Sequence, residues 1–287
     1  MLSLHRKSKK MQTESKYYAN TFVMVNLTVI FYSERGRSVC SYAYSSNNPV
    51  NRIDQDGCAD FWVNGKVIGN DGVDDQRILV IKTTEKSYSS KEDNSYVEAA
   101  GLFKKDQKAT IDFIKANSGN AEAFQKNGIA YTNSIAIESS ADNRQSMVDI
   151  VSADNGRGGT ADANNREYGG SIQNGTVVAA TAGEVVNPAV QSSASIMLPV
   201  GTSTFHSHPS GDVVVSSNPN SGIGASSSFG GPTSTSSFNQ FPSSIDVRGA
   251  GGNTHYVFGR GDGKVYVYTS GGVQAVIPLK QFVIPKR

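Results

Sequence analysis

Two histidines that stand one residue apart are the part of this sequence best suited to chemistry. They lie in the segment TSTFHSHP, residues 202–209, as His206 and His208. Because side chains alternate between the two faces of a β-strand, both histidines would project from the same face. Two imidazoles so placed can bind one metal ion, and catalytic zinc sites combine three protein ligands with an open fourth position. The pattern therefore indicates a zinc site whose third ligand comes from elsewhere in the chain.

A carboxylate downstream can supply that third ligand as an oxygen donor. Asp246 ends the segment SSID, residues 243–246, in which either serine could cap a helix. Asp212, four residues after His208, is the alternative. We favour Asp246, because only Asp246 has the Ser-x-x-Asp spacing.

A carboxylate upstream can move the proton. Glu167 begins the segment EYGG, residues 167–170, at the start of a predicted hairpin. A carboxylate beside a zinc site can take a proton from water and pass it to the leaving group. Glu184 is the alternative base, but it stands in a Gly-Glu turn, where a solvated side chain is the simpler interpretation.

Three other polar segments are predicted to have no catalytic or metal-binding role. His255 precedes the apolar residues Tyr-Val-Phe on a predicted strand, which favours a surface or core histidine over a ligand. Asn70-Asp71-Gly72 and Asp154-Asn155-Gly156 lack the 12-residue spacing and the final glutamate of a calcium loop. Both segments are therefore predicted to be turns.

In this order, the glutamate, the His-x-His-Pro segment and the Ser-x-x-Asp segment resemble the JAMM (MPN-plus) metallopeptidases. The resemblance covers about residues 145–250. It implies that three side chains bind zinc, namely His206, His208 and Asp246. It also implies that Glu167 is the general acid/base and that Ser243 hydrogen-bonds the oxyanion or the metal-bound water. The two glycines that follow Tyr168 fit the Glu-x-Gly-Gly habit of the family.

The spacing between His208 and Asp246 departs from that family. Typical members have only a short segment there, whereas here residues 209–245 intervene, 37 in all. Residues 210–242 are mostly Ser, Gly, Asn, Thr and Pro without hydrophobic periodicity, which predicts a long mobile loop. Such an insertion is tolerable, because the entropy cost of closing a loop grows only logarithmically with its length.

A second resemblance lies nearer the N-terminus. The residues YAY at 42–44, NNPVNRID at 47–54 and DG at 56–57 resemble the end of an Rhs/YD-repeat core. In Rhs proteins this element closes a β-cocoon and marks the junction with a variable C-terminal effector. The resemblance implies a polymorphic toxin with a JAB-like effector domain, secreted or associated with the cell envelope and delivered to a target cell. Its partners would be the Rhs shell in cis and, as a possible partner, an immunity protein.

These motifs divide the chain into three parts. Residues 1–36 form an N-terminal segment without assignment, residues 37–60 the Rhs-like element, and residues 61–287 the JAB-like domain. We predict an α+β fold with a JAB/MPN-like, cytidine-deaminase-like mixed sheet and flanking helices. Residues 104–126 predict two helices separated by Gly119. Strands are predicted at residues 61–63, 66–68, 78–81, 146–151, 167–181, 195–208, 254–259, 264–269 and 273–278.

Bulk properties narrow the function classes. The 287 residues carry a net charge of only +2, so we expect no nucleic-acid partner. The apolar stretch 21–32 is too short to span a bilayer, so we expect no stable membrane insertion. Cys40 and Cys58 form no CxxC motif, which argues against a thiolate zinc site and against a zinc nucleobase deaminase.

The function expected from these patterns is that of a zinc metallohydrolase. It would cleave an amide or isopeptide bond in a protein or peptide substrate. The alternative is a non-catalytic JAB-like module that binds a partner or caps the Rhs shell, with the metal absent or structural. No motif selects the substrate.

Overall fold

The computed structural model describes residues 58–91, 94–216 and 233–286. The N-terminal segment 1–36 and residues 37–57 of the Rhs-like element 37–60 lie outside the described residues. One compact unit comprises Ala59–Asp71 and the residues from Arg77 onward. The sheets, helices and side chains discussed below belong to this unit. The exceptions are Cys58, the first residue of β1, and residues 72–74, the last three of β2.

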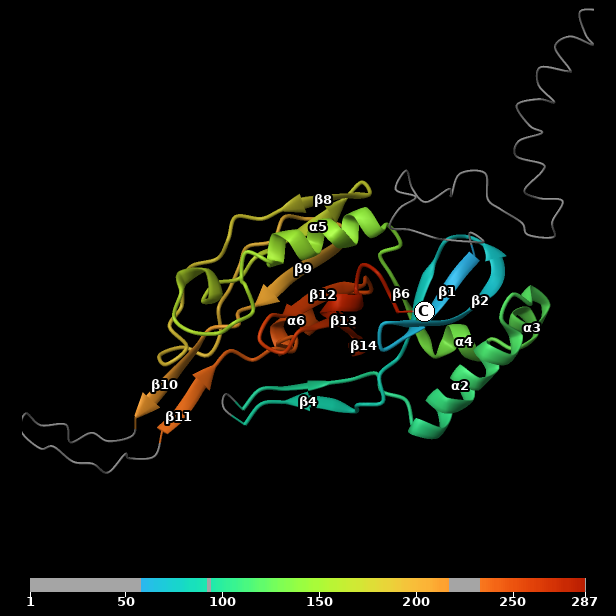
Figure 1. The fold of residues 1–287 in the computed structure, drawn as a ribbon, viewed down its shortest axis with the longest axis horizontal. Helices are drawn as coiled ribbons and strands as arrows, with labels where there is room; N and C mark the ends of the chain where they lie inside the picture. Colours follow the sequence, from blue (N-terminus) through green and yellow to red (C-terminus); the bar gives the residue numbers. More distant parts are fainter. Residues whose placement is uncertain (1–57, 92–93, 217–232, 287) are drawn as a thin grey trace, which may run out of the picture. The chain divides into compact units, whose positions relative to one another are not determined.

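A mixed six-stranded sheet carries the two predicted histidine ligands, with the strand order β14-β13-β12-β9-β7-β8 (Figure 1). β9 and β12 are parallel, whereas the other neighbouring pairs are antiparallel. β9 therefore has a hydrogen-bonded strand on each side. The strands of this sheet are β7 (Gly169–Gln173), β8 (Thr176–Ala179), β9 (Ser203–His208), β12 (His255–Gly259), β13 (Lys264–Thr269) and β14 (Gly272–Pro278).

A second sheet has the order β2-β1-β3-β6, and two ribbons pair β4 with β5 and β10 with β11. These strands are β1 (Cys58–Val63), β2 (Lys66–Asp74), β3 (Ile78–Ile81), β4 (Ser87–Ser89), β5 (Tyr96–Glu98), β6 (Ser134–Ile137), β10 (Asp212–Ser216) and β11 (Thr233–Ser237). The helices are α2 (Lys104–Asn117), α3 (Ala121–Lys126), α4 (Ile129–Thr132), α5 (Ala141–Val151) and α6 (Ser244–Gly249), with 3-10 turns η2 (Asp162–Asn164) and η3 (Leu279–Gln281). Among the described residues, no helix is both long and apolar enough to cross a membrane.

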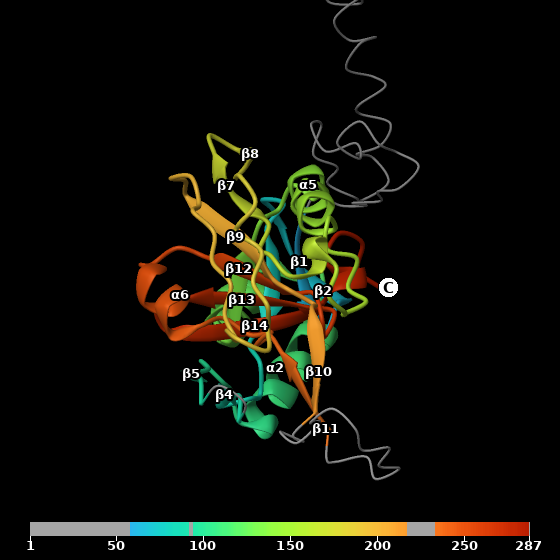
Figure 2. The ribbon, with the colours of Figure 1, turned by 90° about the vertical axis from the view of Figure 1, so that its left-hand side faces the viewer.

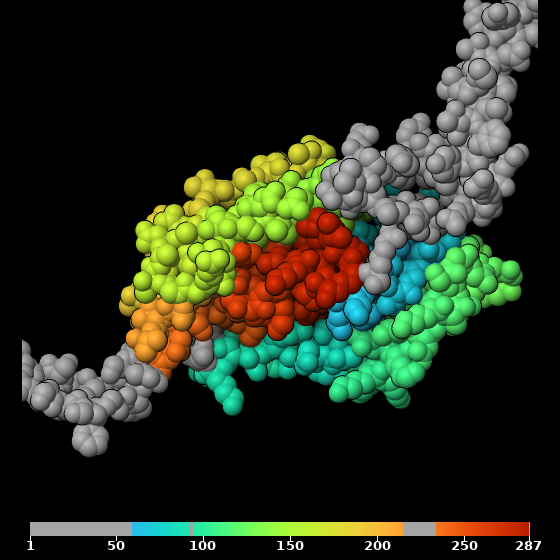
Figure 3. All heavy atoms as spheres, in the orientation of Figure 1, coloured from blue at the N-terminus to red at the C-terminus, as the bar shows by residue number. Residues whose placement is uncertain are grey.

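The two faces of the six-stranded sheet pack against different helices. Phe205 and Phe258 share a buried cluster with Met147 of α5 on one face. Val257 and Tyr266 point the other way and pack with Ala250, which caps the C-terminal end of α6. Figure 2 shows α5 and α6 on opposite sides of the strands. In the space-filling view, the yellow-green atoms of α5 lie against the red atoms of the C-terminal part of the chain (Figure 3).

The helices α2 and α3 cover the four-stranded sheet. Phe61 and Leu79 from the strands share a buried cluster with Ile114 of α2 and Phe124 of α3. The rings of Phe61 and Phe124 stack with centroids 5.4 Å apart. This apolar packing under α2 and α3 is separate from the cluster beneath β9, to which the four-stranded sheet also contributes Trp62, Val80 and Ile137.

The predicted α+β class is confirmed, because helices pack on sheets that mix parallel and antiparallel pairs. The two helices predicted in residues 104–126 are α2 and α3, and Gly119 between them has a φ of 80°. The predicted strands at 61–63 and 66–68 belong to β1 and β2, and Asn64-Gly65 joins them in a hairpin turn, with a φ of 49° at Asn64 and 72° at Gly65. Positive φ at both positions is what a two-residue type I′ hairpin turn requires.

The strand predicted at residues 146–151 is wrong, because these residues form the second half of α5. Ser140 caps this helix with a side chain that accepts a hydrogen bond from the N–H of Asn143. The buried residues of the helix recur at intervals of three and four, as an amphipathic helix requires: Ala141, Arg144, Met147 and Val151. The short apolar run at its end resembles a strand only when the earlier residues are ignored.

The prediction of a mobile loop at residues 210–242 is wrong at both ends. β10 and β11 pair along their whole length, from Asp212 opposite Ser237 to Ser216 opposite Thr233. The residues between, 217–232, lie outside the described residues. Two smaller predictions also change: the strand predicted at 195–208 begins only at Ser203, and Asn70-Asp71-Gly72 lies within β2 instead of a turn.

Candidate metal centre

The two histidines lie at the centre of the six-stranded sheet. In β9, His206 pairs with Val257 and His208 with Gly259 of the parallel strand β12. Both imidazoles are buried on the face that carries α6, while Phe205 points to the opposite face and packs on Phe258. The strand predicted for the His-x-His segment is therefore confirmed, and its period of two places both rings on one side.

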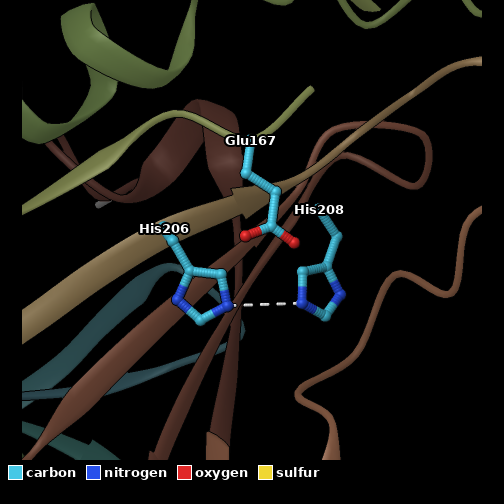
Figure 4. Close-up of side chains that lie close together, drawn as sticks. All are labelled: Glu167, His206 and His208. Atoms are coloured by element: carbon cyan, nitrogen blue, oxygen red, sulfur yellow. Dashed lines mark hydrogen bonds between the residues drawn. The ribbon is translucent and has the colours of Figure 1, made fainter. Parts of the chain in front are cut away.

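Four predicted side chains converge at this point. The Nε2 atoms of His206 and His208 lie 3.3 Å apart. Asp246 approaches from α6, with Oδ1 3.4 Å from Nε2 of His206 and Oδ2 3.7 Å from Nε2 of His208. A carboxylate oxygen of Glu167 and one nitrogen of each histidine lie within 4.8 Å of one another. Figure 4 shows the Glu167 carboxylate pointing toward the space between the two rings.

Glu167 is held beside β9 by the backbone that follows it. Tyr168 exchanges two hydrogen bonds with Ser207: the Ser207 N–H donates to the Tyr168 carbonyl at 2.7 Å, and the Tyr168 N–H donates to the Ser207 hydroxyl at 2.9 Å. At Gly169, an added Cβ would lie 2.3 Å from the Phe205 carbonyl oxygen and 2.9 Å from both Cα and Cβ of His206. Only glycine allows β7 to approach β9 this closely, which explains a glycine two residues after the glutamate.

Asp246 is held by the first turn of α6. Ser243 caps this helix: its hydroxyl accepts from the N–H of Asp246 at 3.1 Å, and its own N–H donates to Oδ2 of Asp246 at 2.6 Å. This capping box fixes the carboxylate and leaves Oδ1 on the side of His206. The predicted helix start is therefore confirmed, with Ser243 and not Ser244 as the cap. A hydroxyl that accepts one hydrogen bond can still donate its proton, and Ser243 lines the cavity at the centre.

The hydrogen bonds of the two imidazoles differ. Nδ1 of His208 lies 2.8 Å from the carbonyl oxygen of Asn239, to which only an Nδ1–H can donate. The lone pair of His208 is then on Nε2, the atom that faces His206 and Asp246. Nδ1 of His206 is buried and has no hydrogen-bond partner among the described residues.

The charges at the centre are coupled. Burial lowers the pKa of His206, but the charge of Asp246, a hydrogen bond to it and the charge of Glu167 together raise this pKa to about 9. Burial alone would raise the pKa of Asp246, but the two histidines hold it well below its usual range. The centre therefore favours a carboxylate beside positive charge, which a metal cation can supply in place of protons.

The donor set fits a metal ion. The group formed by Glu167, His206 and His208 could hold one. Zinc binds imidazole nitrogen at about 2.0–2.1 Å, so two ligands of a tetrahedral ion lie about 3.3–3.4 Å apart. The Nε2 atoms of His206 and His208, 3.3 Å apart, have this separation, and so have Nε2 of His206 and Oδ1 of Asp246, at 3.4 Å. The other oxygen of Asp246, Oδ2, lies 3.7 Å from Nε2 of His208.

A cavity of about 360 Å³ opens above these side chains. The segment between β8 and β9 forms one wall with both polar and apolar side chains, namely Gln191, Ser192, Ser193, Ala194, Ser195, Ile196 and Leu198. Phe238 and Ile245 contribute further apolar surface to the cavity. Among the described residues, no lysine or arginine lines the cavity, and the ionisable side chains that do line it belong to the centre itself.

The alternatives to the predicted site residues lie elsewhere. The carboxylate of Asp212 accepts from the N–H of Gly159, and Glu184 is exposed and does not line the cavity. His255 is a buried core residue, as predicted: its Nε2 donates to the Ala250 carbonyl at 2.7 Å, and its Nδ1 accepts from Thr204. Of the five predicted site residues, four thus converge and Ser243 lines the same cavity.

Two groups that support the centre were not anticipated from the sequence. Asn239 acts through its backbone carbonyl, for which no side-chain pattern exists. Asp154 forms the predicted turn with Gly156, but it is also fully buried and binds Ser210, two residues after His208. A carboxylate in a turn-forming segment gives no signal of such burial.

Comparisons of this chain with protein-family models, with curated proteins and with solved structures found no match.

Proposed function

We propose that this chain is a zinc-dependent hydrolase of amide or isopeptide bonds in a protein or peptide substrate. The convergence of two imidazoles and two carboxylates on one buried point, beside an open cavity, carries the proposal. The order of these residues in the sequence, which resembles the JAMM metallopeptidases, supports a peptidase over other zinc hydrolases.

The three zinc ligands in this proposal are His206, His208 and Asp246. Asp246 is preferred to Glu167 because its oxygens lie 3.4 and 3.7 Å from the two Nε2 atoms and its carboxylate is fixed by Ser243. Two nitrogens and one oxygen leave a fourth position free, as catalytic zinc sites do. When bound, zinc supplies a Lewis acid that polarises a carbonyl and activates water near neutral pH.

The remaining residues handle the proton and the developing charge. Glu167 is buried, with a carboxylate oxygen within 4.8 Å of a nitrogen of each histidine, where it can accept a proton from water and return it to the leaving amine. The Ser243 hydroxyl can donate to the carbonyl oxygen of the substrate while it continues to accept from Asp246. The cavity wall at 191–198 can align an extended substrate above the centre.

The proposal is tested by metal content and by hydrolysis of a mixed peptide library. Wild-type protein is expected to bind one zinc per chain, and the double variant His206→Ala/His208→Ala none. Asp246→Asn is expected to weaken zinc binding, whereas Glu167→Gln is expected to keep zinc and lose hydrolysis. Asp162→Asn, in an exposed and uninvolved position, is the matched control. A correctly folded wild-type protein that takes up no zinc overturns the proposal.

One observation favours a second candidate, a non-catalytic module with a structural metal. A carboxylate oxygen of Glu167 lies within 4.8 Å of a nitrogen of each histidine, so a small movement of this side chain would let it bind the same metal ion. If both carboxylates bind, four protein donors fill the metal, as they do in structural zinc sites. Glu167→Gln distinguishes the two: a large loss of zinc affinity supports the structural module, and retained affinity supports the enzyme.

We also propose that this hydrolase is the effector of an Rhs-type polymorphic toxin, exported with its shell and neutralised by an immunity protein. The basis is the Rhs-like element at residues 42–57 alone. Expression of wild-type protein in bacterial cytoplasm and periplasm, beside Glu167→Gln, tests it. Growth inhibition by the wild type only is the expected result, and equal growth of both strains in both compartments contradicts it.

A further inference from the structure

His208 stands where β9 ends, so its position depends on contacts beyond the strand. It is the last residue of β9, and Pro209, which has no N–H, follows it. Its carbonyl oxygen accepts from the N–H of Arg260 at 3.1 Å. The segment after it must be held by other groups if the imidazole is to stay near His206 and Asp246.

Asp154 holds that segment. Oδ2 of Asp154 accepts from the N–H of Ser210 at 2.7 Å, and Oδ1 accepts from the Ser210 hydroxyl at 2.6 Å. Oδ1 also accepts from the N–H of Gly156 at 2.8 Å. Asp154 has no exposed surface, and a buried carboxylate is costly unless its oxygens are satisfied in this way. Three donors on two oxygens fix both the loop of Asp154 and the backbone after His208.

Arg260 connects the same groups from the other side. Its Nε and Nη2 atoms donate to the backbone carbonyl of Asp154 at 3.1 and 2.5 Å, while its N–H holds the carbonyl of His208. Asp154 lies three residues beyond Val151, which is fully buried at the end of α5. The backbone after His208 is thus tied to the core through α5 and to β12 through Arg260.

We propose that Asp154 is a positioning residue for the metal centre: it sets the place of the His208 imidazole through Ser210. This inference rests on the proposed zinc site. A carboxylate is required because asparagine offers a single acceptor oxygen, and its NH₂ group would face an N–H or O–H donor. Residues that orient a ligand from behind typically change metal affinity by about 10–100-fold when they are replaced.

The experiment uses the full chain with Asp154→Asn and Ser210→Ala, and with Asp162→Asn as a control on an exposed carboxylate of the same loop. Zinc affinity is measured by competition with a chelator, and the ligand geometry by the visible spectrum of the protein saturated with Co²⁺. Asp154→Asn is expected to weaken zinc binding about 10–100-fold and to shift the Co²⁺ bands. Ser210→Ala, which keeps the N–H bond to Asp154, is expected to cause a smaller change of the same kind.

A purely structural role is separated by a destabilised variant remote from the centre. Ile114→Val lies in the separate apolar cluster under α2 and α3 and should lower the melting temperature without moving the Co²⁺ bands. If Asp154→Asn and Ser210→Ala both give the wild-type spectrum and zinc affinity, the inference is overturned while the zinc site stands. If Asp154→Asn does not fold, Ser210→Ala alone decides. If the wild type binds neither metal, the proposed function itself fails.

Discussion

The close approach of β7 to β9 at Gly169 can be tested by adding one methyl group. In Gly169→Ala the new Cβ would lie 2.3 Å from the Phe205 carbonyl oxygen and 2.9 Å from Cα and Cβ of His206. All three atoms belong to the backbone or the first side-chain atom of β9, so no rotation of a side chain relieves the contact. The two strands must separate, and Glu167, two residues before the glycine, must move away from His206.

The magnitude follows from two opposing effects. Inserting a methyl group into a packed region costs about 1–3 kcal/mol, and obstruction by backbone places this case near 3. Alanine restricts the unfolded chain more than glycine does, which returns about 0.4–1 kcal/mol. The free energy of unfolding should therefore fall by about 2 kcal/mol. For a unit of this size, that lowers the melting temperature by about 4–8 °C.

The assay is thermal unfolding followed by circular dichroism, together with peptide hydrolysis. Gly128→Ala is the matched control, since a Cβ there meets nothing within 4 Å and its φ of −76° suits alanine. Because Gly128 is the N-cap of α4, where alanine is less favourable than glycine, we expect the control to melt slightly below the wild-type temperature and to keep full activity. A Gly169→Ala protein that melts within about 1 °C of wild type and hydrolyses peptide equally well would refute the proposed contact between these strands.

Three further changes give different outcomes. Ser243→Ala removes an oxyanion donor and should lower kcat roughly 100-fold with zinc content unchanged, as measured by steady-state kinetics. The same change removes the helix cap and should lower the free energy of unfolding by about 1 kcal/mol, as measured by thermal unfolding. His255→Phe leaves the Ala250 carbonyl without its donor and should lower stability by about 2 kcal/mol with zinc stoichiometry unchanged, measured by denaturant unfolding and metal analysis. Arg144→Met removes a buried guanidinium that donates to four backbone carbonyls, and the free energy of unfolding should fall by at least about 3 kcal/mol. Arg157→Met, at an exposed position, is the control and should lower it by no more than about 0.5 kcal/mol.

The parts of the centre that could be predicted from the sequence are those governed by short-range periodicity. His206 and His208 share a face because a strand repeats every two residues, and the SSID segment begins a helix because serine caps it. The strand order that brings Glu167 next to β9 is a long-range property, which no local pattern specifies. The resemblance of the order Glu, His-x-His-Pro and Ser-x-x-Asp to a known family supplied that expectation instead.

The failures have physical reasons as well. The end of α5 was predicted as a strand because Met147, Val148, Ile150 and Val151 form a short apolar run, and such runs are ambiguous between strand and buried helix. β11 was missed because its residues, TSTSS, have no apolar alternation, and its partner β10 supplies the pairing. The role of Asn239 depends on a backbone carbonyl, which every residue has.

The ribbon of β10 and β11 accounts for the long spacing between His208 and Asp246. Because these strands are antiparallel, Asp212 lies opposite Ser237, and the chain that leaves the centre after His208 returns beside it. The returning segment then contacts the centre directly, through the Asn239 carbonyl on His208 and through Gln240, whose Nε2 donates to the Pro209 carbonyl at 2.9 Å. Paired strands hold both ends of the insertion in place, so its length has little effect on where Asp246 lies. The 37 residues between His208 and Asp246 are therefore compatible with the close approach of these two side chains.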